Sequence, residues 1–310
     1  MKANPVSVGV VCGIVFCGIS AAFDVYVSNI TQTLEPSVFI VYCFIIATTI
    51  FTSISLFRSG TSYLKKSFQD IRLLTKVNVA VMLNWGGLIL SLKYLEPAVV
   101  GIASVACGPA LTIVISRYFI RSSSPPNRTE ALIAWIILFG VIIMLINSYF
   151  GKSGVVDTSN IERLIGIISV VCSAIGTVLY TFFSKDLGQK GWKSYEILGL
   201  RNLFMLLIAF AYCNYNSINL ITTEGLLLTI ILLSVLGHVI PVFLIQKSIS
   251  ILDPIHISLL LLLLPVFTLL LQFFDSRIFI SWESILSVVM ITFLLIFLGI
   301  NKFKAKKRGM

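Results

Sequence analysis

A seven-residue motif occurs twice in this chain, 157 positions apart, and this repetition constrains the fold more than any other feature. Ser91–Pro97 reads SLKYLEP and Ser248–Pro254 reads SISILDP, so each copy closes on a leucine, an acid and a proline. Each copy lies between two long apolar segments, and each is followed by a further proline, Pro109 or Pro265. A membrane protein with two repeated halves is typical of the transporters.

Long apolar segments indicate that the chain lies in a lipid bilayer. It is 57% hydrophobic and 12% charged, with a mean hydropathy of +1.00, which lies outside the range of soluble domains. The first apolar segment is too long and too weakly flanked for a cleaved signal peptide, so we expect a retained helix. Segments that reach the roughly 20 residues needed to cross a hydrocarbon core occur at 6–29, 36–57, 76–94, 97–117, 130–149, 161–184, 195–213, 225–246, 255–274 and 283–301.

Ten expected helices and the offset of the repeat predict two halves of five helices, at 1–150 and 151–310. Five is an odd number, so the second half enters the membrane from the opposite face and the two repeats are inverted. A solute site is then expected near the middle of the membrane, where the halves meet. The polar stretches 58–75 and 150–160 are expected to be ordinary loops. We therefore expect an all-α integral membrane protein without a separate soluble domain.

The lysines and arginines indicate how the chain is oriented. If the N-terminus is inside, most of the 23 Lys and Arg residues fall on the inner side, in the loops near 58–76, 117–128 and 185–193 and in the C-terminal tail. The positive-inside rule then predicts a multi-pass protein of the bacterial inner membrane with both termini in the cytoplasm. The net charge of +10 faces anionic lipid on this interpretation, and we expect no nucleic-acid partner.

Polar side chains inside the expected helices are the candidates for a solute cavity. A carboxylate near a helix centre costs roughly 2.5–3.5 kcal/mol in lipid, so Asp24 is the first candidate, with Ser20 on the same helix face. At an offset of about 156 residues, Ser173 and Tyr180 share one face of the expected sixth helix, and Thr177 lies between them. Close packing of small residues is the alternative explanation of such stripes, although it explains Asp24 and Tyr180 poorly.

The middles of the expected third and eighth helices carry further candidates. Asn84 and Trp85 lie in the third, and His238 lies in the eighth. An ionisable group at mid-membrane depth is a functional candidate by default, and a histidine can titrate near neutral pH and couple transport to protons. A neutral histidine bonded to a backbone carbonyl is the alternative. Trp85 offers an aromatic face to an apolar or cationic ligand, or it fills space.

Helices four and nine carry the expected hinges. Ser104 belongs to a small-residue stripe beside Pro109, and Pro265 occupies the corresponding place among leucines. A proline frees a backbone carbonyl and permits a bend, so the two prolines are candidate gating hinges or simple kinks. Arg201, at the inner end of the expected seventh helix, is expected to snorkel to the surface or to pair with Glu196.

Several chemistries are not expected. The six cysteines lie within or at the edges of apolar segments and lack the spacing of metal ligands, so we expect no metal and no cofactor. There is no P-loop motif for ATP. An integral-membrane enzyme is an alternative that would need several ionisable groups meeting at one interface. The sequence favours a secondary transporter of a small molecule, with protons as the candidate coupling ion, acting as a monomer or weak homodimer.

The two long repeats SLKYLEPAVVGIASVACGPALTIVIS and SISILDPIHISLLLLLLPVFTLLLQ, in a chain of ten expected helices, resemble the EamA-type transporters of the drug/metabolite transporter superfamily. The resemblance covers the whole chain. It implies a basket-like bundle in which helices 1, 3, 4, 6, 8 and 9 line a central cavity. Members often carry an arginine early in helices 2 and 7. Arg201 matches the second arginine, whereas Tyr42 and Cys43 stand in place of the first.

The same resemblance gives an expectation of function. It implies export of an amino acid or related metabolite by alternating access. Import or exchange of S-adenosylmethionine or another nucleotide-derived solute is the alternative that it leaves open.

Overall fold

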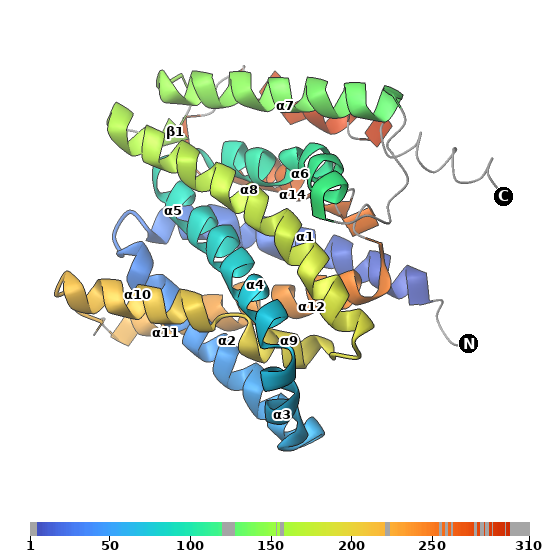
Figure 1. Cartoon of the computed structure of the whole chain (residues 1–310). Coiled ribbons are helices and arrows are strands. Elements are labelled where there is room, and N and C mark those ends of the chain that lie inside the picture. The colour runs from blue at the N-terminus through green and yellow to red at the C-terminus, as the bar shows by residue number, and fades with distance from the viewer. Residues whose placement is uncertain are drawn as a thin grey trace.

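Helices make up nearly all of the structure (Figure 1), a computed structural model that describes residues 5–119, 128–152, 154–155, 158–220, 224–253 and, with short gaps, 256–297. This follows from the composition, because backbone groups in lipid must form hydrogen bonds within the chain and a helix bonds all of its own. Seven of the described helices are long and apolar enough to cross a membrane. The chain is therefore an all-helical, multi-pass membrane protein.

The first half follows the expected segments. In contrast to the expected loop at 58–75, a short helix lies between the second and third long helices. The rod that spans 71–94 contains a π-helical segment, η1. The helices are α1 (Pro5–Ile30), α2 (Pro36–Ser59), α3 (Ser62–Gln69), α4 (Ile71–Val81), η1 (Met82–Gly86), α5 (Gly87–Tyr94), α6 (Pro97–Phe119) and α7 (Arg128–Tyr149).

The second half also contains two short strands that the sequence analysis did not anticipate. The strands pair antiparallel, with Gly154 opposite Phe279. The expected ninth and tenth segments, 255–274 and 283–301, lie partly outside the described residues. The elements are β1 (Gly154–Val155), α8 (Asn160–Gln189), α9 (Ser194–Leu200), α10 (Leu203–Tyr215), α11 (Glu224–Leu232), η2 (Leu233–Val239), α12 (Ile240–Ile251), α14 (Leu263–Gln272) and β2 (Ile278–Phe279).

The repeated motif ends a helix in the same way in both copies. Leu95 leaves α5 with φ −118° and ψ 159°, and Leu252 leaves α12 with φ −94° and ψ 158°. In each copy the leucine N–H donates to the motif's serine carbonyl, at 2.9 Å to Ser91 and 2.8 Å to Ser248. Pro97 then begins α6, where a missing N–H costs nothing.

Close approach between backbones fixes α8 against the rod that spans residues 71–94. A Cβ on Gly176 would lie 2.3 Å from the backbone N of Asn84, and a Cβ on Gly87 would lie 2.3 Å from the backbone O of Ser169. These separations are possible only for glycine. Part of the small-residue stripe on α8 therefore serves packing, which is the alternative that the sequence left open.

Two helices contain π-helical segments at the positions of the mid-membrane candidates. η1 holds Asn84 and Trp85, and η2 holds His238. A π-helical segment inserts into an α-helix at a cost and often marks a functional site. Both segments redirect side chains relative to a regular helix.

The rod that spans 194–215 is broken at Arg201 and Asn202, between α9 and α10. One side chain of α4 bonds the backbone groups on both sides of the break. Asn78 Nδ2 donates to Leu200 O at 2.8 Å, and Phe204 N donates to Asn78 Oδ1 at 3.2 Å. Irregular backbone at membrane depth is tolerated only where it is buried in protein or lines a cavity, and this bonding satisfies that condition.

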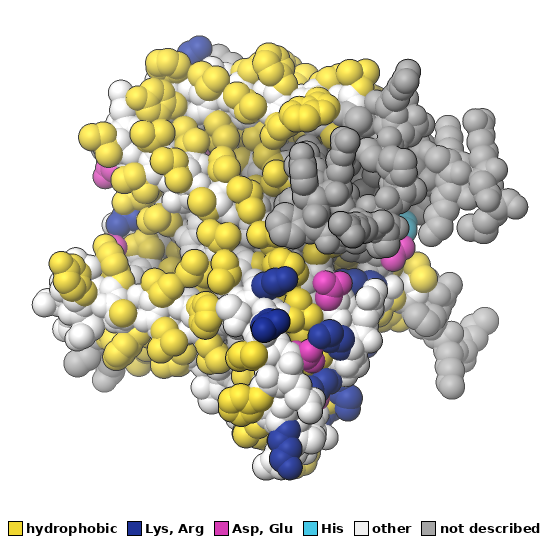
Figure 2. Space-filling view, viewed as in Figure 1, with side chains coloured by type: hydrophobic (Ala, Val, Ile, Leu, Met, Phe, Trp, Pro, Cys, Tyr) yellow, Lys and Arg dark blue, Asp and Glu magenta, His cyan; other side chains and the backbone are white. Residues whose placement is uncertain are grey.

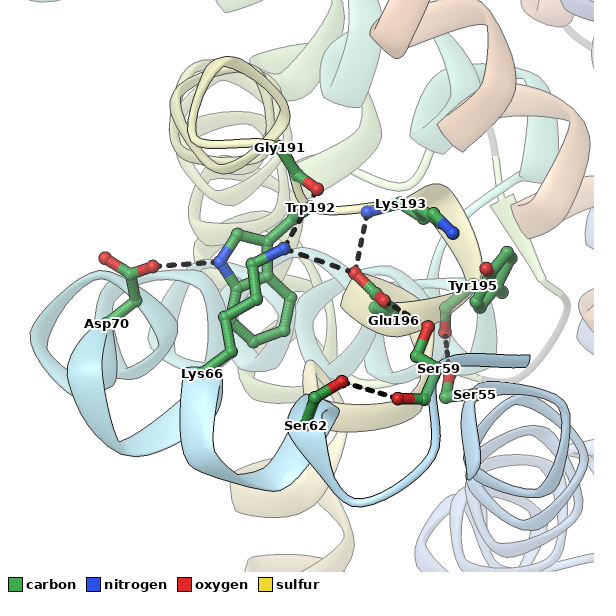
Figure 3. A network of polar contacts seen from close by, with 10 residues as sticks. All are labelled: Ser55, Ser59, Ser62, Lys66, Asp70, Gly191, Trp192, Lys193, Tyr195 and Glu196. Atoms are coloured by element: carbon green, nitrogen blue, oxygen red, sulfur yellow. Dashed lines mark hydrogen bonds and ion pairs between the residues drawn. The ribbon is translucent and has the colours of Figure 1, made fainter. Parts of the chain in front are cut away.

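Polar side chains connect α3 to the turn between α8 and α9 (Figure 3). Lys66 Nζ donates to Gly191 O at 2.9 Å and lies 3.5 Å from Glu196 Oε2. Glu196 also accepts from Ser59 Oγ at 2.6 Å and from Lys193 N at 2.9 Å. We call this set of contacts the α3 network.

The same network includes an ion pair at the end of α3. Asp70 accepts from Lys190 Nζ at 2.5 Å and from the Trp192 indole at 2.9 Å. Hydrogen bonds from Lys190 and then Trp192 are the main causes that hold the pKa of Asp70 below its ordinary value. The carboxylate is therefore the favoured form in the folded chain.

The surface separates into two zones. On the face shown in Figure 2, hydrophobic side chains cover most of the described surface, and Lys and Arg side chains gather over α3 and the neighbouring ends of α4 and α8. Large apolar side chains such as Phe139 and Leu207 are exposed along their helices. This pattern is typical of a bundle with lipid around its length and water at one basic end.

Candidate functional site

A cavity lies inside the bundle, and both halves of the chain contribute to its wall. Its volume is about 80 Å³, several times what one water molecule needs. The first half supplies α1, η1, α5 and α6, and the second supplies α8, the break before α10, α12 and α14. The lining residues are Phe16, Ser20, Asp24, Asn84, Trp85, Leu88, Ser104, Val105, Thr177, Tyr180, Thr181, Arg201, Val242, Ile245, Ile249, Ile257, Leu261 and Leu264.

Most of the residues that the sequence singled out lie on this wall. α1 presents one face to the cavity, since Phe16, Ser20 and Asp24 recur every four residues. Ser20 Oγ is buried and has no hydrogen-bond partner among the described residues, so it is free to bond a molecule in the cavity. The other candidates on the wall are Asn84, Trp85, Ser104, Thr177 and Tyr180. Solute binding by Ser20, Asp24 and these residues stays a prediction.

Asn84 connects η1 to the polar face of α8. Its Oδ1 accepts from Thr177 Oγ1 at 3.1 Å and from Ser173 Oγ at 3.4 Å. Ser173 is not among the residues that line the cavity, although it was a candidate for its wall. Its hydroxyl fixes the orientation of the Asn84 amide group, because both hydrogen bonds end on the same oxygen.

His238 lies next to the cavity wall and does not form part of it. Its ring centroid lies 4.5 Å from that of Trp85, 4.8 Å from that of Phe44 and 6.4 Å from that of Phe23. The ring is buried, and neither nitrogen has a hydrogen-bond partner in the described part of the chain. The histidine ring therefore packs against Trp85, and its role in proton coupling stays a prediction.

The two candidate hinges differ in what the structure describes. Pro265 is buried in α14, and its Cα would lie 3.6 Å from a Cβ placed on Gly101 of α6. The side chain of Pro109 lies outside the described residues. Gating by either proline stays a prediction.

The position of the Arg201 side chain differs from the prediction. Arg201 was expected to reach the surface or to pair with Glu196, but its side chain is 1% exposed and lines the cavity. Its Cζ lies 4.9 Å from the centre of the Tyr180 ring. The physical reason is the break between α9 and α10, which turns Arg201 inward, while Glu196 bonds Ser59, Lys66 and Lys193.

Gln246 does not line the cavity but holds Tyr180, which does, and the sequence analysis missed it. It is buried in α12, and its side-chain oxygen accepts the Tyr180 hydroxyl proton. The available signal was a lone amide in an otherwise apolar segment, which has to find a partner in lipid. The apolar side of the cavity, with Val242, Ile245 and Ile249, follows the same helix at helical spacing.

Comparison with known families identifies the second half of the chain. Residues 164–300 match the EamA-like transporter family. They form an EamA-like transporter domain. This EamA-like domain includes most of α8 and the whole of α9 to β2, so it supplies Thr177, Tyr180, Arg201 and the α12 face of the cavity. The matched family is one of transporters, which indicates membrane transport of small solutes by this domain.

The chain also resembles solved structures. One, described only as "Crystal structure of protein", has a TM-score of 0.64 and 14% sequence identity and covers 95% of this chain and 95% of its own. At this identity the likeness shows the fold alone. A comparison with curated proteins found no match.

Proposed function

We propose that this EamA-like protein is a secondary transporter of the bacterial inner membrane that exports an amino acid or a related small metabolite by alternating access. The observation that supports the proposal is the cavity, because both halves of the chain line it and its wall contains both polar and apolar side chains. Helices of a single chain enclose the cavity, which is consistent with a monomer or a weak homodimer. We further propose ten helices in two inverted repeats, supported by the matching helix ends at Leu95 and Leu252.

The α3 network is the proposed closure on the cytoplasmic side. It joins α3, in the first half, to the turn between α8 and α9, in the second. Inward opening would separate these segments and break the contacts of Glu196 and Asp70. Ion pairs of this kind, partly open to water, are weak enough to break and reform during a transport cycle.

Asp24 is the proposed proton-coupling group. It is the acidic residue among the described residues that line the cavity. A carboxyl group at this depth can alternate between proton and solute as the cavity changes sides. Asp24→Asn should then abolish uptake driven by a pH gradient while solute exchange continues. Exchange and gradient-driven uptake that fall together would contradict the coupling role.

Transport by purified protein in liposomes tests the function itself. Labelled amino acids, S-adenosylmethionine and nucleosides are offered with and without an imposed pH gradient. Thr177→Leu narrows the cavity and should lower the initial rate at least about tenfold, because a well-packed wall accommodates added methyl groups poorly.

The matched control is Thr229→Leu. Thr229 lies on α11 and is not among the residues that line the cavity; its hydroxyl donates to Gly225 O at 3.0 Å. The transport rate of Thr229→Leu should therefore equal that of the wild type. The proposal of amino-acid export fails if no amino acid in the panel moves faster than through empty liposomes. Transport of S-adenosylmethionine alone would select the alternative solute.

A further inference from the structure

We propose that Arg201 is the anchor for an oxyanion on the transported solute, a carboxylate or a phosphoryl group, and that it restricts the cavity to solutes that carry such a group beside an apolar portion. The inference rests on the proposed transport function and specifies the solute class of the same cavity. It comes from one buried side chain whose hydrogen-bonding capacity is not satisfied within the described residues.

An arginine side chain is charged under all physiological conditions. Arg201 is 1% exposed, and its Nε and Nη2 have no hydrogen-bond partner among the described residues. Burial of an unpaired charge is strongly unfavourable, so such a group is retained where a ligand completes it. Arg201 also lines the cavity, and the missing partner can therefore be a molecule held there.

The two unpartnered nitrogens define the shape of the ligand group. Nε and Nη2 lie on the same edge of the guanidinium plane, and their N–H bonds point in parallel. Two parallel donors match the two oxygens of a carboxylate or phosphoryl group in a bidentate contact. A neutral amide or hydroxyl offers no such pair of acceptors.

The guanidinium is held in position before any ligand binds. Its Cζ lies 4.9 Å from the Tyr180 ring centre, within the range of a cation–π contact. The Tyr180 hydroxyl donates to Gln246, which fixes the ring between α8 and α12. Arg201 lies at the break between α9 and α10. The side chain of Asn78 bonds the backbone on both sides of this break, so the guanidinium is not needed there.

The rest of the cavity wall indicates that the solute also carries an apolar portion. Val242, Ile245 and Ile249 of α12 line the cavity that Arg201 also lines. Asp24 lines it as well, but the ion pairs found in the described part of the chain do not include one between Asp24 and Arg201. The arginine is thus available to a small solute with an apolar body and an anionic head.

Ligand-dependent thermal stabilisation of the purified full chain in detergent tests the anchor. The probes are 4-methylpentanoate and its uncharged amide, and butyl phosphate with inorganic phosphate, which separate the carboxylate from the phosphoryl arm. At least one anion should stabilise the wild type, and 4-methylpentanamide should not. Arg201→Met should weaken that anion's apparent affinity by about tenfold or more. Arg201→Lys should recover it only in part, because lysine lacks the paired donors.

Two controls separate binding from folding. Arg201→Met removes an unpaired buried charge, so its melting temperature without ligand should equal or exceed that of the wild type. Arg58 is the matched arginine, since it is exposed and stacks on Tyr195 at 5.7 Å. Arg58→Met should bind the anion as the wild type does.

The anchor is overturned if acid and amide stabilise equally, if Arg201→Met keeps the anion affinity, or if no anion stabilises the wild type. Transport remains separate from these outcomes. Liposome flux of a neutral solute that is unchanged in Arg201→Met would leave transport standing and remove the anchor. Anion binding that depends on Arg201, without flux of any solute, would support the anchor and contradict transport.

Discussion

Asn78 stabilises a break in a membrane-spanning rod through a single side chain. It donates to Leu200 O and accepts from Phe204 N, so Asn78→Leu removes the side-chain partner of two partly buried backbone groups. We expect a loss of about 1–3 kcal/mol in the free energy of unfolding, measured by denaturation in detergent. The control is Asn216→Leu, which removes an exposed amide bonded to Tyr212 O at 3.0 Å; its effect should stay within about 0.5 kcal/mol. Equal effects of the two changes would contradict the role of Asn78.

Glycines of α8 offer a second comparison of single residues. Gly176→Ala places a Cβ 2.3 Å from the Asn84 backbone N, whereas Gly188→Ala on the same helix meets nothing within 4 Å. The first change should cost about 1–3 kcal/mol through overpacking. The second should be neutral or slightly stabilising, because alanine favours the helix. Melting temperatures of the two variants provide the measurement, and a tolerated Gly176→Ala would show that the two rods can separate.

Sequence alone gave good candidates for side chains whose burial in lipid is costly. Asp24, Asn84 and Tyr180 could be selected one by one, because each is an expensive residue in an apolar segment, and all three line the cavity. The position of Arg201 could not be predicted in this way. It depends on a helix break that a residue more than a hundred positions earlier, Asn78, stabilises, and no periodicity within the seventh segment carries that information.

Between the elements, the contact of α3 with the end of α8 should depend on pH. The pKa of Asp70 is lowered in the folded chain, first by the hydrogen bond from Lys190 and then by that from Trp192. Its contribution to stability is therefore complete above the ordinary carboxyl pKa of 3.8 and is lost as the pH falls through the lower folded-state value. Asp70→Asn should lower the melting temperature at neutral pH, by the equivalent of about 1 kcal/mol or less.

The difference between wild type and Asp70→Asn should narrow in acid, below the pKa of the unfolded chain. Lys190→Met should reproduce the neutral-pH effect, and the double variant should add little to either change, because both remove the same pair. A difference that widens as the pH falls would mean that another group controls this contact.

Elements with a regular period were predictable, and the irregular ones were not. The segments 36–57 and 130–149 correspond closely to α2 and α7, since about 20 apolar residues in sequence leave few alternatives. The π-helical segments η1 and η2 depend on packing against neighbouring helices. The strand pair β1–β2 joins two-residue pieces that are too short to show alternation.

For the molecule as a whole, the basic end defines an orientation that labelling can test. Ser62, at the start of α3, and Asn216, after α10, are both exposed. In intact cells, a membrane-impermeant maleimide should modify Asn216→Cys and spare Ser62→Cys, because the positive-inside rule places the α3 end in the cytoplasm. Permeabilised cells should show labelling at both positions. The reverse pattern in intact cells would invert the predicted topology.

The overall architecture was predictable to the level of a helical membrane bundle. Seven candidate spans lie in the described residues, and the repeated motif ends α5 and α12 alike. The central cavity followed from the family resemblance, and its polar lining from the cost of polar groups in lipid. How the two halves enclose the cavity is set by contacts such as Gly176 on Asn84, which a single sequence does not reveal.

The surroundings of Trp192 make its intrinsic fluorescence a probe of conformational change. The indole is buried, donates to Asp70 at 2.9 Å and lies 4.7 Å from the Lys66 ammonium. Separation of α3 from the turn after α8 would transfer this ring into water and shift its emission to longer wavelength. Trp85, Trp135 and Trp282 are the other tryptophans, so the difference spectrum between the wild type and Trp192→Phe isolates the signal. The opening of one end of the molecule can then be followed in real time, without an attached dye.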